Sequence, residues 1–324
     1  MVALSVQIEI AQGLSWARWK RIVAEVDRLG YLGLYCCDHF LPGASGYVDS
    51  AEIMTAFTYL ADHSQRLEFG SLVAPVSFRD PVWLIRQAMA LDDLSGGRFV
   101  LGVGAGWMER EHAMFGYELG DRATRAARLA EALEVMTLLS RHDEPVSFDG
   151  RFYHLREAKL LPHSPRPGGP RLLIGGSGPK RTLPLTARYA DAWNAGGQSP
   201  AAFRENSARL DELIVKAGRQ PGDVRRTLMQ QVICYRDEAD LGRRLRFPDD
   251  EGSGQSPGAR LEALRGRSPN VIAGSPAAVI EQVQAYAAAG VEEIMVQRLD
   301  LDDIEGLQLI AEEVMPRVSS ASSR

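Results

Sequence analysis

The chain of 324 residues has only three cysteines, Cys36, Cys37 and Cys234, and two of them are adjacent. Three cysteines cannot make the disulfide framework of a small secreted domain, so we expect them to be reduced and buried in a cytoplasmic protein. A basic excess is also missing. The formal net charge of −5 excludes a general nucleic-acid binder.

Long apolar runs are absent as well. No segment approaches the roughly 18 apolar residues that span a bilayer. The N-terminal residues 1–7 lack the basic and apolar regions of a secretory signal. We therefore expect a soluble protein that takes a small-molecule substrate, with no membrane partner and no nucleic-acid partner.

Several catalytic signatures are lacking. The chain has no Gly-x-Ser-x-Gly elbow and no cysteine–histidine pair in a supporting context, which argues against covalent hydrolysis. No metal site is expected, because the histidines lie in different elements without ligand spacing. The histidines in question are His112, His142, His154 and His163.

Glycine, in contrast, is plentiful at the end of one predicted strand. The segment Phe99–Val103 overlaps three alternate glycines between positions 102 and 106. A dinucleotide fingerprint needs a glycine at position 107 or 109, and these positions hold Trp107 and Glu109. The fingerprint is therefore excluded, but bare backbone at a strand end still implies that something approaches it closely.

Short apolar strands alternate with amphipathic helices along the chain, in eight strand–helix units. This order favours an α/β fold of the (β/α)₈ TIM-barrel type. A doubly wound sheet, the alternative, would place its glycine turn after the first strand rather than after the fourth and fifth. We expect one domain over residues 1–318 and a disordered tail at 319–324. The predicted strands are Leu4–Ile10, Leu32–Cys37, Leu67–Val73, Phe99–Val103, Arg171–Ile174, Asp191–Asn194, Arg226–Tyr235 and Val291–Gln297.

Two segments interrupt this alternation. Glu144–Leu155 carries the turn Asp149-Gly150 between two short apolar stretches, which predicts an inserted β-hairpin. Phe247–Asn270 is rich in Gly, Ser, Pro and Asp and has no periodicity. It predicts a mobile loop near the barrel mouth, before the last unit.

Polar groups at the carboxyl ends of barrel strands are the candidates for chemistry. Asp38-His39 follows the second strand, where the imidazole suits proton transfer or a structural role in the loop. Ser71, before the end of the third strand, lies either in a bulged backbone that faces a ligand or in a plain strand. Trp193, at the end of the sixth strand, either walls a flat ligand or belongs to the core.

The fifth strand ends in a second glycine-rich turn. Gly175-Gly176-Ser177-Gly178 is followed by Lys180 and Arg181 and then by a predicted helix. Free backbone N–H groups, a hydroxyl and two cations form a good phosphate site, and a tight turn with surface charges is the alternative.

These strand ends together resemble the bacterial-luciferase-like flavin oxidoreductases, and most closely their coenzyme F420-dependent branch. The resemblance covers residues 4–315. It rests on six motifs in order: Asp-His-Phe, Leu-x-x-Gly-x-Leu-Val with Arg-Asp-Pro, Ser-Gly-Gly-Arg-Phe-x-Leu-Gly-x-Gly-Ala-Gly-Trp, Glu-Pro-Val-x-Phe-x-Gly-x-Phe-Tyr, Ile-Gly-Gly-Ser-Gly and Tyr-Ala-Asp-Ala-Trp-Asn. FMN-dependent members share most of these motifs.

The resemblance implies a barrel with a deazaflavin or flavin across its carboxyl mouth. His39 and Asp38 would be the catalytic residues beside the ring, and the Ser71–Leu72 bond matches the position of a non-prolyl cis peptide in this family. The residues implied to bind the cofactor are Asp38, His39, Ser71, Leu72, Val73, Gly104, Ala105, Gly106, Gly175, Gly176, Ser177, Gly178, Lys180 and Trp193.

The function implied is hydride transfer between reduced F420 and an unidentified organic substrate, with His39 assisting a proton. An FMN-dependent monooxygenase that uses O₂ and a non-catalytic flavin-binding barrel are the alternatives. F420-dependent sugar-phosphate dehydrogenases carry a proton-donating glutamate where this chain has Trp107, so sugar-phosphate oxidation by that mechanism is not expected.

The resemblance also implies a homodimer that pairs through Ser50–Asp62, Pro81–Leu94 and Arg122–Arg141. The substrate would be selected by three segments of low periodicity, 41–49, 107–120 and 247–270.

Overall fold

The computed structural model describes residues 1–43, 46–245 and 254–319, and its strands close into a ring. Every neighbouring pair in the ring is parallel, and the pairing of Ala3 with Glu293 joins the last strand to the first. The ring strands are β1 (Ala3–Ile8), β2 (Gly33–Cys36), β3 (Glu68–Ser71), β5 (Phe99–Gly104), β8 (Arg171–Gly175), β9 (Ala192–Gly196), β10 (Arg225–Cys234) and β12 (Glu293–Arg298). The predicted (β/α)₈ barrel is confirmed.

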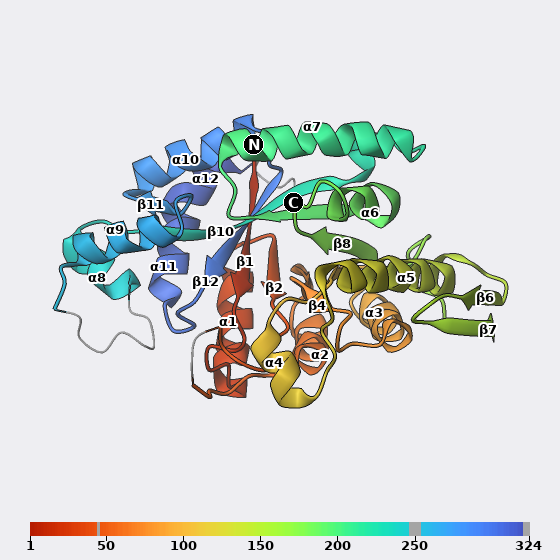
Figure 1. The fold of residues 1–324 in the computed structure, drawn as a ribbon. Helices are drawn as coiled ribbons and strands as arrows, with labels where there is room; N and C mark the ends of the chain where they lie inside the picture. Colours follow the sequence, from red (N-terminus) through yellow and green to blue (C-terminus); the bar gives the residue numbers. More distant parts are fainter. Residues whose placement is uncertain (44–45, 246–253, 320–324) are drawn as a thin grey trace.

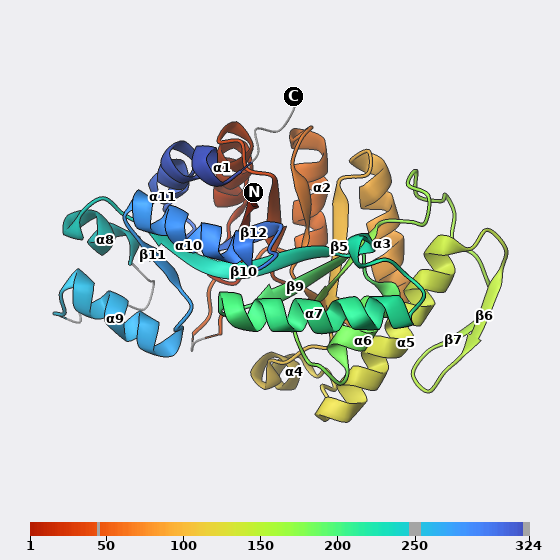
Figure 2. The same cartoon turned by 90° about the horizontal axis from the view of Figure 1, so that it is seen from above.

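Helices surround this ring, as the two ribbon views show (Figures 1 and 2). Two segments named above, Pro81–Leu94 and Arg122–Arg141, are helical over the same residues. The helices are α1 (Trp16–Arg28), α2 (Ile53–His63), α3 (Pro81–Leu94), α4 (Glu109–Phe115), α5 (Arg122–Arg141), α6 (Thr182–Tyr189), α7 (Pro200–Lys216), α8 (Glu238–Arg244), α9 (Pro257–Arg267), α10 (Pro276–Ala288), α11 (Ile304–Leu309) and α12 (Met315–Val318), with a 3₁₀ turn at Pro221–Asp223 and a π-helical turn at Ile310–Val314. Among the described residues, no helix is both long and apolar enough to cross a bilayer.

The inserted hairpin is present, and it extends from one side of the barrel (Figure 1). Its strands β6 (Val146–Asp149) and β7 (His154–Ala158) pair antiparallel, as predicted.

The predicted loop over 247–270 is wrong for much of its length. Positions 247–253 lie outside the described residues, but α9 occupies Pro257–Arg267. The Ser256 hydroxyl accepts a hydrogen bond from Ala259 N, and a proline opens the helix. Asp80-Pro81 and Ser275-Pro276 begin α3 and α10 in the same way. A side-chain acceptor before proline favours helix initiation, and the Gly/Ser-rich flank hid this signal.

Charged side chains fill the amino-terminal end of the barrel. Glu68 accepts hydrogen bonds from Arg171 Nη1 at 2.6 Å and from Arg225 Nη1 at 2.9 Å. Arg225 also pairs with Glu293 at 3.3 Å, and Ser5 Oγ donates to the same carboxyl group. A cavity of about 750 Å³ opens at this end, among these paired charges. Paired charges at the bottom of a barrel serve stability, whereas chemistry belongs to the opposite end.

Candidate functional site

The carboxyl ends of seven barrel strands surround a cavity of about 370 Å³, within the range of small-molecule sites. Residues from both the strands and the loops that follow them reach it. The lining residues are Glu9, Cys37, His39, Leu72, Val73, Pro75, Gly104, Ala105, Gly106, Trp107, Glu111, Gly175, Met229 and Gln297.

A bulge after β3 pushes Val73 toward the cavity. Gly70 pairs with Val100 on β5, whereas Ala74, in the short strand β4 (Ala74–Pro75), pairs with Val103. Three residues of the first strand therefore face two residues of β5, which defines a β-bulge. The non-prolyl cis peptide bond lies between Leu72 and Val73.

The expected position of that cis bond, Ser71–Leu72, is thus wrong by one residue. The Ser71 side chain does not line the cavity. It is fully buried, and its hydroxyl donates a hydrogen bond to the Gly102 carbonyl at 2.7 Å. β3 pairs regularly with β2 through Ser71. The irregular backbone of the bulge therefore begins after Ser71, at positions 72 and 73.

Bare backbone at the ends of β5 and β8 leaves space that Val73 fills. A Cβ atom on Gly104 would lie 2.6 Å from Val73 Cγ2, and one on Gly175 would lie 3.1 Å from Val73 Cγ1. Gly106 has φ +80°, and a side chain there would meet Ser77. The glycines at 104 and 106 that looked like a dinucleotide fingerprint therefore shape the wall of this cavity.

His39 and Glu111 form a buried pair on one side of the cavity. His39 Nδ1 lies 3.0 Å from Glu111 Oε1, and Phe40 N donates to Glu111 Oε2 at 3.1 Å. Only 1% of the Glu111 side chain is exposed. Burial opposes the charged form of His39, but the hydrogen bond and charge of Glu111 outweigh it and raise the pKa of His39 above 6.5.

Because Nδ1 faces Glu111, Nε2 is the ring nitrogen left for chemistry. His39 also makes an edge contact with the ring of Trp107, at 5.6 Å between centroids. The imidazole is therefore held between a carboxylate and an indole, and its charge state responds to both burial and Glu111.

Asp38 is engaged elsewhere. Its carboxylate pairs with Arg79, at 2.5 Å to Nε and 2.9 Å to Nη2, and Arg79 also contacts Glu52 at 2.9 Å. Burial raises the pKa of Asp38 despite the opposing effect of Arg79. Asp38 is absent from the cavity lining. In this arrangement it anchors the start of the loop that carries His39.

Glu9, which follows β1, supplies a second carboxylate to the cavity. Gln297 Nε2 donates to Glu9 Oε1 at 2.9 Å, and Gln7 Nε2 donates at 3.1 Å. The Cys37 side chain is also hydrogen-bonded to Glu9. Burial, followed by the charge of Glu9, raises the pKa of the Cys37 thiol well above its ordinary value, so this thiol stays protonated.

Aromatic side chains cluster next to the residues that carry the His39–Glu111 pair. Phe40 lies 4.5 Å from Phe115 and 5.1 Å from Phe78, and Phe78 lies 5.6 Å from Tyr117, between ring centroids. We call these four residues the aromatic rim. Trp107 is 63% exposed although it lines the cavity.

The glycine-rich turn after β8 meets the cavity only through Gly175. Gly176 N donates to Asn194 O, and Gln198 Nε2 donates to Ser177 Oγ. The Gly178 carbonyl accepts from Thr182 N and Leu183 N, both at 3.0 Å, at the start of α6. Gly178 and Lys180 are exposed on this turn.

Trp193 does not wall the cavity. It is fully buried, stacks on Phe203 of α7 at 5.0 Å and donates from Nε1 to the Gly176 carbonyl at 2.8 Å. The core alternative for this residue is the one that the structure has, because its strand position points outward toward α7. Trp193 therefore stabilises the glycine-rich turn through its hydrogen bond to Gly176.

The sequence reading did not single out six residues of this cavity lining: Glu9, Cys37, Pro75, Glu111, Met229 and Gln297. Cys37 directly precedes Asp38. Glu9 and Gln297 lie at alternate positions of the first and the last predicted strand, so the strand register could have indicated that their side chains face the barrel interior. Glu111 lies two residues after Glu109 in α4, and nothing in the linear pattern pairs it with His39.

The fold and the site define a (β/α)₈-barrel protein with a small-molecule cavity at the carboxyl ends of its strands. The chain belongs to the luciferase-like monooxygenase family, whose model matches residues 2–293. The predicted family is confirmed.

Relatives with different reactions are similar to this chain. One is an F420-dependent glucose-6-phosphate dehydrogenase from Amycolatopsis mediterranei (strain U-32), 26% identical over 90% of this chain and 91% of that protein. Another is the pyrimidine monooxygenase RutA of Methylorubrum extorquens, 30% identical over 60% of this chain and 52% of that protein.

Solved structures share the fold. An F420-dependent secondary alcohol dehydrogenase, in complex with an F420-acetone adduct, has a TM-score of 0.81 at 18% identity over 98% of this chain and 99% of that chain. The monooxygenase RslO1 from Streptomyces bottropensis has a TM-score of 0.78 at 17% identity over 98% and 100%.

Proposed function

We propose that this chain is an F420-dependent oxidoreductase that transfers a hydride between reduced F420 and an organic substrate. One observation carries the proposal: a buried His39–Glu111 pair faces strand ends that carry no side chains. The similarity to an F420-dependent dehydrogenase over 90% of the chain supports the choice of cofactor.

The residues present suit a planar ring. Gly104 and Gly175 present backbone to the cavity, and Val73 rises between them on the bulge. A flat ligand would rest on Val73 and Leu72, with Gly104, Ala105 and Gly106 along its edge. The same arrangement has no room for a larger side chain at position 104, because a Cβ there already meets Val73.

F420, when bound, supplies the carbon that accepts or gives the hydride. His39 then holds or releases a proton at Nε2, because Glu111 occupies Nδ1. Glu111 keeps the imidazole in one orientation through its own two hydrogen bonds. Asp38 acts indirectly: its carboxylate binds Arg79 and anchors the loop that carries His39.

The turn after β8 is the proposed phosphate contact. Gly176, Ser177 and Gly178 form the turn that precedes α6, and Lys180 adds a positive charge to it. The positive end of a helix and a nearby cation both favour an anion. Trp193 supports this turn by its hydrogen bond to Gly176.

An FMN-dependent monooxygenase is the second candidate. The family model is described as luciferase-like monooxygenase, and pyrimidine monooxygenases are among the relatives. A fluorescence titration with F420 and FMN in parallel separates the two, followed by turnover with and without oxygen. Tight FMN binding with no F420 affinity would reject the proposal. If His39→Ala changed neither binding nor any activity, the third reading, a non-catalytic flavin-binding barrel, would stand instead.

We also propose that residues 1–318 form a single cytoplasmic domain.

We propose that this domain works as a homodimer. A groove of about 680 Å³ runs between α1, α2 and α3 and is lined mainly by apolar side chains. Trp16 and Leu94 at its edges are 44% and 52% exposed. Exposed apolar surface of this kind marks a partner surface, and a second copy would cover it.

A further inference from the structure

The charged side chains that line the cavity are mainly acidic. Glu9 and Glu111 contribute two carboxylates and His39 contributes one titratable imidazole. No lysine or arginine belongs to the lining within the part of the chain that the structure describes. His39 compensates Glu111, to which it is hydrogen-bonded. Glu9 is then the carboxylate of the lining that has no basic side chain beside it in the lining, and it would repel an anion buried next to it.

Two arginines that contact residues at or beside this cavity are already engaged. Arg79 is bound to Asp38 and Glu52. Arg125 donates from Nη1 to the Gly106 carbonyl at 3.2 Å. None of these interactions leaves an arginine head group in the cavity lining.

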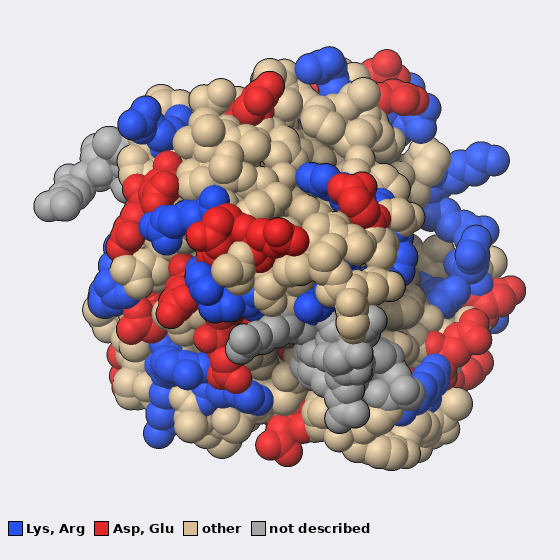
Figure 3. Space-filling model, turned by 90° about the vertical axis from the view of Figure 1, so that its left-hand side faces the viewer, with Lys and Arg blue, Asp and Glu red and all other residues tan. Residues whose placement is uncertain are grey.

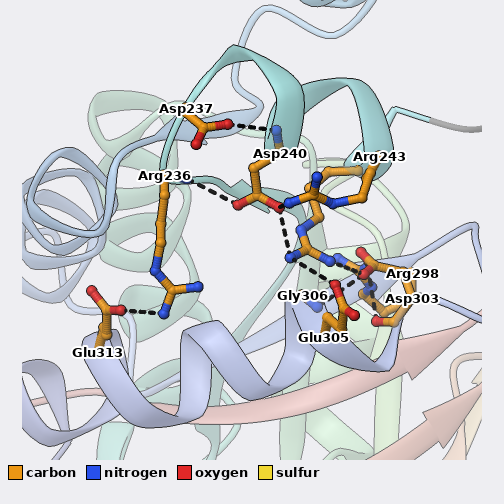
Figure 4. A network of polar contacts seen from close by, with 10 residues as sticks. Arg236, Asp237, Asp240, Arg243, Arg298, Asp303, Glu305, Gly306 and Glu313 are labelled. Atoms are coloured by element: carbon orange, nitrogen blue, oxygen red, sulfur yellow. Dashed lines mark hydrogen bonds and ion pairs between the residues drawn. The ribbon is translucent and has the colours of Figure 1, made fainter.

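A buried network also takes up the arginines beside the ends of β10 and β12 (Figure 4). Arg244 of α8 contacts Asp240 at 2.8 Å and also pairs with Asp303. Arg298, the last residue of β12, pairs with Asp303 as well. Only 5% of the Arg244 side chain and 9% of the Arg298 side chain are exposed. These two cations hold α8 against the start of α11 and do not serve a ligand in the cavity.

Glu9 is the carboxylate whose position is set for a ligand. The amides of Gln7 and Gln297 converge on its Oε1 atom, which fixes the group at the cavity wall. Glu111, in contrast, spends both oxygens on His39 and Phe40. The Cys37 side chain contacts Glu9 as well. A carboxylate has about four lone-pair sites, so Glu9 can still accept a hydrogen bond from a ligand in the cavity.

Apolar side chains lie in the cavity and next to it. Trp107 and Met229 line the cavity itself, in addition to the Leu72–Val73 bulge on which the cofactor ring is proposed to rest. The aromatic rim lies beside the residues that carry the His39–Glu111 pair, and Phe115 and Tyr117 are 48% and 40% exposed. Apolar walls with one placed acceptor are typical of sites that bind an uncharged or cationic organic molecule.

We propose that Glu9 selects the substrate. The substrate is an apolar, ring-bearing molecule that offers a hydroxyl or an ammonium group to Glu9 and carries no anionic group. This inference rests on the proposed function for the identity of the site, and it excludes sugar phosphates and carboxylates as substrates. Trp107, which stands where a proton-donating glutamate was expected for sugar-phosphate oxidation, then serves as a wall for the ring.

Three ligands that share one ring test this: benzyl alcohol, benzylammonium and benzoate. Isothermal titration calorimetry measures their binding to the protein, with and without bound F420. We expect the alcohol and the ammonium ion to bind at least about tenfold more tightly than benzoate, because like charges repel in a desolvated site. Glu9→Gln should largely remove the preference for benzylammonium over benzoate.

Glu109→Gln is the matched control, since Glu109 is an exposed carboxylate on α4 outside the cavity lining. It removes the same charge nearby and should keep the preference. Benzoate that binds as tightly as benzylammonium, or no binding of any of the three at millimolar concentration, overturns the inference. The experiment without cofactor keeps this outcome separate from the proposed function, which the F420 titration decides independently.

Discussion

At the scale of single residues, the site depends on the balance between burial and charge at His39. Burial alone favours the neutral imidazole, and Glu111 reverses that preference through a 3.0 Å contact. A raised histidine pKa adds stability that is fully present below its ordinary value of 6.5 and is lost as pH rises through the folded value. The same shift keeps His39 able to release a proton at higher pH than a free histidine.

Glu111→Gln tests this balance. The variant keeps the size of the side chain but removes the charge that raises the pKa of His39. We expect its His39 pKa to fall, and the histidine limb of the pH–rate profile to move toward lower pH. A loss of about 1–3 kcal/mol in stability is expected, because a charged hydrogen bond inside the protein is weakened. NMR titration of His39 and kcat/KM against pH are the measurements.

Unfolding by denaturant below and above pH 6.5 provides the second check on the same variant. The stability difference between the parent protein and Glu111→Gln should shrink as pH rises, because the parent loses the charged pair. A difference that stays constant with pH would contradict the assignment. Asp149→Asn is a suitable control, since it changes a carboxylate beside the exposed His154 instead.

Residues at strand ends could be predicted because the barrel rule places them at one mouth. His39, Val73, Gly104 and Gly175 all reach the cavity as the sequence indicated. Glu111 could not be paired with His39, because they are 72 positions apart and only the packing of α4 joins them. Asp38 and Trp193 were predicted to contact the ligand. Instead, Asp38 binds Arg79, and Trp193 packs against Phe203 of α7.

At the scale of elements, β3 and β5 approach each other so closely that only glycine fits at two positions. A Cβ atom on Gly70 would lie 1.8 Å from the Val100 carbonyl oxygen, and one on Gly102 would lie 1.9 Å from the Ser71 carbonyl oxygen. The bulge that carries Val73 begins directly after this close contact. The glycines therefore serve the strand pair first, and the cavity through it.

Gly102→Ala should accordingly destabilise the protein by about 3 kcal/mol or more, because backbone atoms rather than a flexible side chain must move. Gly266→Ala is the matched control: it lies in α9 with open space around its Cβ position. That control should be neutral or stabilise by about 0.5–1 kcal/mol, as alanine does in a helix. Denaturant unfolding of both variants gives the comparison. Equal stabilities would show that the two strands can separate without cost.

Element boundaries were predictable where caps and periodicity agree. α3 and α5 begin and end at the predicted residues. The cis peptide bond lies one residue after its expected position, because strand register decides where the bulge begins. Helix α9 was not predicted, because a short helix within a Gly/Ser-rich segment has too weak a periodicity.

At the scale of the whole molecule, the two ends of the barrel divide the work. The amino-terminal end holds Glu68, Arg171, Arg225 and Glu293 in mutual ion pairs. At the carboxyl end, the cavity lining holds the carboxylates Glu9 and Glu111 but, among the described residues, no lysine or arginine. The face shown in Figure 3 carries acidic and basic side chains mixed together.

The proposed homodimer is the prediction at this scale, because it concerns the face formed by α1, α2 and α3 together. Leu94→Arg places a charge at the edge of the groove that a second copy would cover, so it should convert a dimer to a monomer. Val215→Arg on α7 is the matched control, since Val215 is 60% exposed and lies outside this groove. Sedimentation velocity gives the mass of each variant, and the F420 titration shows whether each is folded. A parent protein that sediments as a monomer would refute the dimer. A Leu94→Arg variant that stays dimeric while binding F420 would move the interface to another face.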